Sequence, residues 1–97
     1  MNYEAIGEII APVALKHGVK RISLFGSRAR GDNREDSDYD FLISKGNVTT
    51  LWALAALMED LENALHASVD VITDGVPDKK LLEEAGRDAV LLYEYKG

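Results

Sequence analysis

The sequence predicts a single α/β domain that extends over residues 1–97. Two observations predict this class: segments with apolar residues at helical spacing alternate with short segments rich in β-branched residues, and turn-forming residues separate them. Hydrophobic residues make up 46% of the chain and charged residues 29%, which is typical of a folded globular domain. No internal repeat or linker interrupts this order, so one hydrophobic core is expected.

Two long helices are expected. The first extends from Asn2 to His17 and ends at Gly18, which suits the left-handed conformation that closes many helices. Pro12 lies inside this helix and is expected to kink it or end it early. The second extends from Thr49 or Thr50, as its capping residue, to about His66. Its predicted buried stripe consists of Leu51, Leu54, Ala55, Met58, Leu61 and Leu65.

Strands are expected between and after these helices. Their predicted ranges are Lys20–Phe25, Asp38–Ser44, Ser68–Thr73 and Ala89–Tyr95, although the last could instead pack as an extended tail or form an interface. Alternation places Ile22 and Leu24 on one face of the first strand, and Tyr39, Phe41 and Ile43 toward the core. Further elements are a short helical turn at 27–31, a loop at 32–37, a turn at Asp74, Gly75 and Pro77, and a last helix at 78–87.

Composition excludes several classes of function. The chain has no cysteine, which rules out disulfides, thiolate metal sites and a cysteine nucleophile. No apolar run reaches the roughly 18 residues that span a bilayer, and the first residues lack a basic targeting region, so a soluble cytoplasmic protein is expected. A net charge of −6 argues against a dedicated nucleic-acid-binding module. However, five of the eleven basic residues lie between Lys20 and Arg34, and this local excess suits a triphosphate.

Three aspartates carry the strongest chemical signal. Asp38 and Asp40 are two positions apart on a predicted strand, so their side chains leave the same face with Cα atoms roughly 6–7 Å apart. Asp70 lies between two valines of another strand, where an unpaired carboxylate is unfavourable. If these strands are neighbours, three carboxylates meet, and their repulsion demands divalent cations. Mg²⁺ suits the site because it prefers carboxylate oxygens together with substrate phosphates.

A second signal follows the first strand. Backbone N–H groups at the start of the segment 26–31 can bind phosphate oxygens, Gly26 permits close approach, and Arg28 and Arg30 add positive charge. Taken alone, Gly26 and Ser27 are more simply a turn and a helix cap. Asp38 alone fits a polar loop, and Asp40 alone fits a surface strand. The combination of the glycine-rich turn with three aspartates favours a catalytic site.

The two motifs together resemble the signature of the polymerase-beta-type nucleotidyltransferases, and most closely the minimal nucleotidyltransferase (MNT) group. The resemblance rests on Gly26-Ser27-Arg28-Ala29-Arg30-Gly31 and, after five residues, on Ser37-Asp38-Tyr39-Asp40. It covers essentially the whole chain and implies the nucleotidyltransferase fold, a small mixed β-sheet flanked by helices. It also implies that two Mg²⁺ ions are held by Asp38, Asp40 and Asp70. ATP is then bound by Gly26, Ser27, Arg28 and Arg30, with Asp70 helping to activate the acceptor hydroxyl.

The resemblance also implies a partner. Many MNT proteins pair with a HEPN-domain toxin and resemble antitoxins that attach AMP to a toxin tyrosine, so a hetero-oligomer with a HEPN toxin is expected, without direct contact to nucleic acid or membrane. Two alternatives stay open. An aminoglycoside-like, small-molecule nucleotidyltransferase would need an acceptor pocket, because this sequence lacks the second domain that holds the drug in aminoglycoside enzymes. A non-catalytic antitoxin would act by binding alone.

The remaining polar and aromatic residues have simpler explanations. His17 and His66 lie near predicted helix C-termini, where an imidazole favours the helix dipole, so no catalytic role is assigned to either. Trp52, Tyr93 and Tyr95 are more simply core or interface residues than platforms for a nucleotide base.

Overall fold

The computed structural model describes residues 2–44, 46–73, 80, 83 and 86–96. In chain order its elements are α1 (Tyr3–His17), β1 (Arg21–Phe25), α2 (Gly26–Arg30), β2 (Tyr39–Ser44), α3 (Leu51–Leu65), β3 (Val69–Thr73) and β4 (Val90–Glu94). The predicted α/β class is confirmed, and each of these elements lies within about one or two residues of its predicted range, which is the usual uncertainty of element boundaries. None of the described helices is long and apolar enough to cross a membrane.

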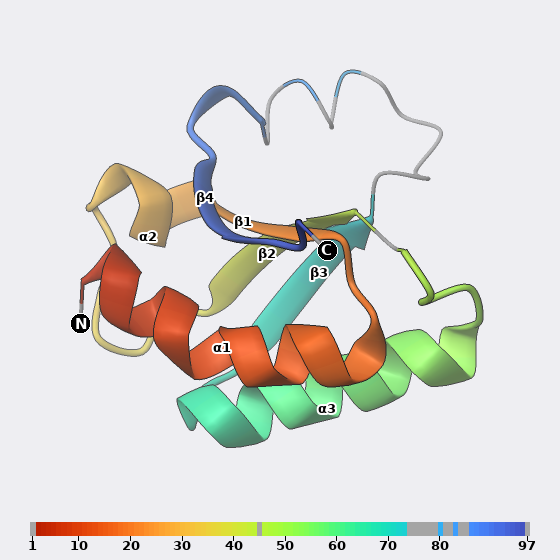
Figure 1. Ribbon diagram of the computed structural model, residues 1–97. Helices are drawn as coiled ribbons and strands as arrows, with labels where there is room; N and C mark the ends of the chain where they lie inside the picture. The colour runs from red at the N-terminus through yellow and green to blue at the C-terminus, as the bar shows by residue number, and fades with distance from the viewer. Residues whose placement is uncertain (1, 45, 74–79, 81–82, 84–85, 97) are drawn as a thin grey trace.

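The four strands form one mixed sheet in the order β3-β2-β1-β4. β1 is antiparallel to both β2 and β4, whereas β2 and β3 are parallel. The parallel pair requires a crossover connection, which α3 provides. α1 and α3 pack against each other and lie across the same side of the sheet, as Figure 1 shows.

Local signals define both ends of α1. Asn2 caps the helix by accepting a 2.7 Å hydrogen bond from the backbone N–H of Ala5, and Gly18 closes it with φ at 69°. The expectation that Pro12 ends the helix early is wrong, because the helix continues to His17. Pro12 cannot bond the Glu8 carbonyl, but both residues are exposed, so water can take the place of the missing N–H.

The core lies between the sheet and the two long helices. Ile22 and Leu24 of β1 are fully buried, as are Phe41 and Ile43 of β2, and Tyr39 is 4% exposed. The strand alternation predicted from the sequence is therefore confirmed. Because Tyr39, Phe41 and Ile43 point inward, the residues between them, beginning with Asp40, face the other side of the sheet.

The predicted buried stripe of α3 is partly wrong. Leu61 and Leu65 are buried as expected, but Leu57 replaces the exposed Leu51 and Ala55 as a core residue. The residues from Leu51 to Met58 are all apolar, so periodicity cannot distinguish the inner side of this part of the helix from the outer side. In Figure 1 the first turns of α3 extend beyond the end of α1, and Trp52 there is 87% exposed rather than part of the core.

The C-terminal segment adds a strand, which settles the choice left open by the sequence. β4 pairs with β1, Tyr93 packs against the core, and Tyr95 is 55% exposed. The predicted turn at Asp74, Gly75 and Pro77 lies outside the described residues. So does most of the predicted helix at 78–87, of which the described positions 80, 83, 86 and 87 are helical.

Candidate active site

Strand pairing brings the predicted aspartates together. β2 and β3 lie side by side, and Asp40 is the direct register partner of Asp70. Asp38 comes immediately before β2, two residues from Asp40. Asp38 and Asp70 are exposed and Asp40 is half-buried. The predicted neighbourhood of the second and third strands is therefore confirmed, and it places the three carboxylates at one exposed end of the sheet.

Gly26 lies against the Asp40 carboxylate. A Cβ atom at position 26 would overlap Oδ2 of Asp40 and would stand 3.2 Å from its Cγ. Gly26 also has φ at 74°, a conformation that favours glycine. Gly26, which follows β1, therefore provides the space that the Asp40 carboxylate occupies. The glycine-rich motif and the aspartate motif thus lie together in one site.

The surroundings of Asp40 perturb its ionisation. Burial raises its pKa above the usual value, the negative charges of Asp70 and Asp38 raise it further, and the Arg30 guanidinium opposes these effects. Like charges that raise the pKa of a carboxyl group are relieved when a cation binds between them. The electrostatics of the site therefore favour a cation beside Asp40.

The start of α2 offers backbone donors to an anion. Its capping residue is Phe25, and no side chain caps the helix there. The first N–H groups of a helix have no partner within the helix, so those at Gly26 and Ser27 can bind phosphate oxygens. These two residues thus offer backbone N–H groups to an anion beside the Asp40 carboxylate.

Arg28 is engaged with the protein itself. Its Nε and Nη2 donate to the Ser37 carbonyl at 3.0 and 2.7 Å, and Nη2 also donates to the Glu35 carbonyl at 3.1 Å. Its guanidinium stacks on the Tyr39 ring, with 4.0 Å from Cζ to the ring centroid. Arg28 thereby holds the loop that leads into Asp38 and Asp40. This contribution to the site was not predicted from the sequence, which suggested only a charge near the phosphates.

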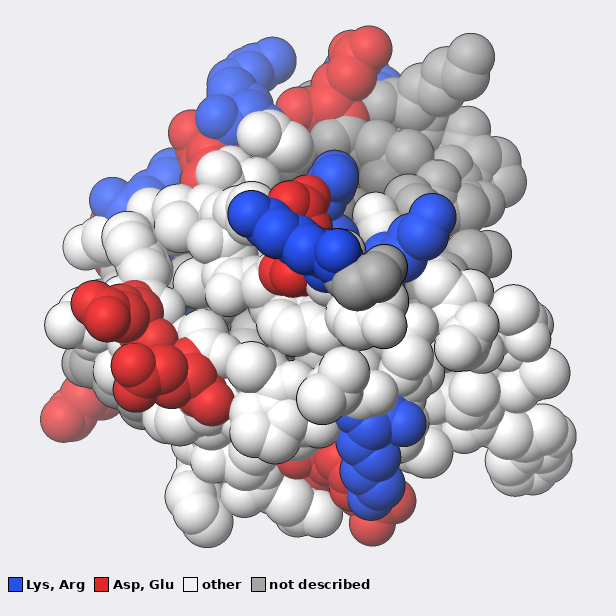
Figure 2. All heavy atoms as spheres, viewed as in Figure 1, with Lys and Arg blue, Asp and Glu red and all other residues white. Residues whose placement is uncertain are grey.

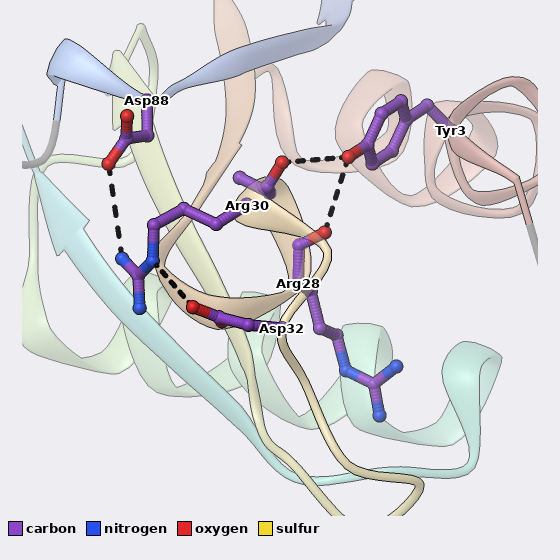
Figure 3. A network of polar contacts seen from close by, with 6 residues as sticks. Tyr3, Arg28, Arg30, Asp32 and Asp88 are labelled. Atoms are coloured by element: carbon purple, nitrogen blue, oxygen red, sulfur yellow. Dashed lines mark hydrogen bonds and ion pairs between the residues drawn. The ribbon is translucent and has the colours of Figure 1, made fainter.

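Figure 3 shows that α2 is held from two sides. The Arg30 side chain points toward Asp32, with 3.2 Å from Nε to Oδ2, and toward Asp88, at 3.9 Å from Nη1 to Oδ2. From the other side the Tyr3 hydroxyl donates to the Ala29 carbonyl at 2.7 Å. No sequence signal identified Tyr3, because it lies 26 residues from its partner and only the fold brings the two together.

The donor set fits magnesium, although the aspartates are not a closed cage. Among the described residues no three His, Cys, Asp or Glu side chains are already arranged around a common metal position. Mg²⁺ is usually bound by one or two carboxylates together with substrate phosphates and water, so a complete protein cage is not required. Asp40 with Asp38 or Asp70, beside the turn at Gly26, matches that pattern.

The fold and this site define a protein class. A strand that runs into a glycine-containing turn, packed against the central aspartate of a neighbouring strand pair, is an arrangement suited to nucleotidyl transfer. The family model for "Polymerase beta, Nucleotidyltransferase" matches residues 8–96. The chain therefore belongs to this nucleotidyltransferase family, and its resemblance to the minimal nucleotidyltransferases is confirmed.

Individual proteins agree with this assignment. The Methanocaldococcus jannaschii protein named "Putative protein adenylyltransferase MJ0435" is 47% identical over 73 residues, which cover 75% of this chain and 78% of that protein. A solved structure, "Structure of putative minimal nucleotidyltransferase", superposes with a TM-score of 0.77 at 35% identity and covers 93% of this chain and 95% of that one.

A more distant structure shares the fold. It belongs to the complex of a tri-AMPylated Shewanella oneidensis HEPN toxin with an MNT antitoxin. The TM-score is 0.73 at 18% identity, over 97% of this chain and 74% of that one. At this identity the likeness shows the fold alone.

Proposed function

We propose that this nucleotidyltransferase transfers AMP from ATP to a hydroxyl group of a partner protein, and that it acts in this way as the antitoxin of a HEPN toxin with a tyrosine as acceptor. The observation that carries the proposal is the contact between Gly26 and Asp40, because it unites a phosphate-binding turn with the aspartates. The expected cytoplasmic location stays a prediction.

Each residue of the site has a role in this proposal. The N–H groups at Gly26 and Ser27 bind the triphosphate, and Arg30 contributes positive charge. Asp38, Asp40 and Asp70 would hold two Mg²⁺ ions, which would supply charge stabilisation for the attacking and leaving oxygens. Asp70 accepts the proton of the acceptor hydroxyl as its oxygen bonds to the α-phosphorus and the bond to pyrophosphate breaks.

Exposure of the site supports a protein acceptor. Asp38 and Asp70 are both exposed, so a residue on another protein can reach them. The names of the similar proteins point the same way, because one is described as a protein adenylyltransferase and another was solved with an AMPylated HEPN toxin. A small-molecule acceptor would instead require an enclosing pocket.

The proposal is tested by transfer of label from α-labelled ATP, with magnesium, to a co-expressed HEPN protein. Asp40→Asn should abolish labelling. Asp36→Asn is the matched control, because it removes the same charge from an exposed position in the loop before β2 and should leave labelling intact.

Each outcome has a clear meaning. Labelling of a tyrosine that depends on Asp40 supports adenylylation of the toxin. A toxin that is neutralised equally well by the Asp40→Asn protein, without labelling, would show an antitoxin that acts by binding alone. Label transferred to an aminoglycoside-like small molecule, but to no protein, would favour the small-molecule alternative.

A further inference from the structure

A continuous groove runs between the outer side of α1 and β4 in the described part of the chain. Three adjoining hollows form it. The first two share Glu8 and Ala11, and the second and third share Leu15, Tyr93 and Tyr95. The groove therefore extends from the first turn of α1, past the end of β4, to the loop that follows α1.

Exposed apolar side chains gather in this groove. Six large apolar residues are exposed in the described chain, and four of them line it, with exposed fractions between 41% and 62%: Tyr3, Leu15, Leu91 and Tyr95. Isolated exposed apolar residues are ordinary, but a contiguous set marks a contact surface. The groove is therefore a candidate interface.

β4 gives the groove an unpaired sheet edge. In the described sheet β4 is the last strand and has β1 as its single neighbour. The N–H and C=O groups on the outer side of such a strand are a template for pairing with another strand. α1 packs closely against β4, because a Cβ on Gly7 would lie only 2.9 Å from the Leu92 carbonyl oxygen. A strand added to the edge of β4 would therefore also cover the exposed side of α1.

Charge is divided between the two ends of the groove. Glu4 and Glu8 line the end beside the start of β4, whereas Lys20 lines the opposite end, and the middle hollow is lined by Glu8, Glu94 and Lys96. Figure 2 shows acidic groups over the N-terminal half of α1, and basic groups with acidic groups among them near the end of β4. If the grooves of two copies of the chain met in antiparallel orientation, the acidic end of each groove would lie against the basic end of the other.

We propose that the occupant of this groove is a second copy of the chain, whose β4 pairs antiparallel with β4 to form a twofold dimer. Antiparallel pairing of the two β4 strands brings Leu91 and Tyr95, which both line the groove, into the contact between the copies, so both exposed side chains become buried. The twofold axis also brings Glu4 toward the partner's Lys96. The aspartates lie on β2 and β3, on the other side of β1, so the dimer leaves the active site accessible.

The first test is sedimentation of the full-length protein over a range of concentrations at physiological salt, where repulsion between the two net charges of −6 is screened beyond about 8 Å. The wild type should reach twice the chain mass of 10.7 kDa. Leu91→Asp should remain monomeric. Leu51→Asp is the matched control and should still dimerise, because Leu51 is 82% exposed but lies outside the groove.

Charge exchange tests the orientation. Glu4→Lys and Lys96→Glu should each weaken the dimer about tenfold, since two symmetric ion pairs become repulsive, and the double variant should recover the wild-type dissociation constant. Circular dichroism verifies that every variant is folded.

Three results would overturn the proposal: a monomeric wild type, a Leu91→Asp protein that still dimerises, or a double variant weaker than both single variants. None of these measurements depends on AMP transfer, so failure of the dimer and failure of the proposed function are distinguishable.

Discussion

Replacing Gly26 by alanine should remove activity without a correspondingly large loss of stability. The added Cβ would occupy the position of Asp40 Oδ2. Because this oxygen is the end of a side chain, rotation of the Asp40 carboxylate can relieve the overlap. The fold then survives, but the central aspartate of the site leaves its place.

Gly31→Ala separates the two effects. Gly31 also has a positive φ, 83°, but a Cβ there would meet no atom within 4 Å. The left-handed conformation costs a non-glycine residue roughly 1–2 kcal/mol, so both variants should lose about that much stability. For a domain of this size each kcal/mol lowers Tm by about 4–8 °C. Displacement of a reacting group by about 1 Å can cost 100-fold in rate, and this cost should fall on Gly26→Ala alone.

The assay combines thermal unfolding with the rate of AMP transfer to an acceptor protein, at equal fractions of folded protein. The two variants should have a similar Tm. The rate of AMP transfer by Gly26→Ala should be at least about 100-fold lower than that of Gly31→Ala, as expected if the Asp40 carboxylate is displaced by about 1 Å. If Gly26→Ala transfers AMP as fast as Gly31→Ala, the contact between Gly26 and Asp40 does not position the Asp40 carboxylate for AMP transfer.

Three further predictions concern charged groups. The raised pKa of Asp40 means that its ionised form destabilises the metal-free fold, so Asp40→Asn should raise Tm at neutral pH, and this gain should disappear as the pH falls below about 3.8. Arg28→Lys should lose about 1–3 kcal/mol and transfer AMP more slowly, because lysine cannot bond two carbonyls while stacking on Tyr39. Hydrogen bonds from His17 and Lys16 lower the pKa of Asp60, so Asp60→Asn should destabilise the protein at neutral pH but not below that lowered pKa.

Each of these predictions has a contrary outcome. A lower Tm for Asp40→Asn without metal would mean that Asp40 has a stabilising partner. Magnesium should stabilise the wild type by about 2.7 kcal/mol at 100 times its dissociation constant, and the same gain in Asp40→Asn would place the ion elsewhere. An Arg28→Lys protein with unchanged rate and Tm would show that Arg28 does not hold the loop. A constant effect of Asp60→Asn at every pH would exclude the ion pairs as its cause.

Elements and motifs were predictable because their signals are local. Asn2 and Gly18 define α1, Thr50 accepts the capping hydrogen bond of α3, and the alternation in β2 separates inward from outward residues. Where local signals were uniform, the prediction was wrong. In the apolar start of α3 no spacing distinguishes Leu51 from Leu57, and the buried residue was decided by where the sheet lies.

The class of fold, the order of the described elements and the candidate site residues could be predicted from local sequence signals, because caps, alternation and a short motif depend on neighbours along the chain. Three contacts became visible only in the folded protein: Asp70 lies opposite Asp40, Gly26 makes room for Asp40, and Arg28 bonds a loop instead of projecting freely. These contacts join residues on different elements, and their geometry depends on strand register and helix packing, which are properties of the whole fold.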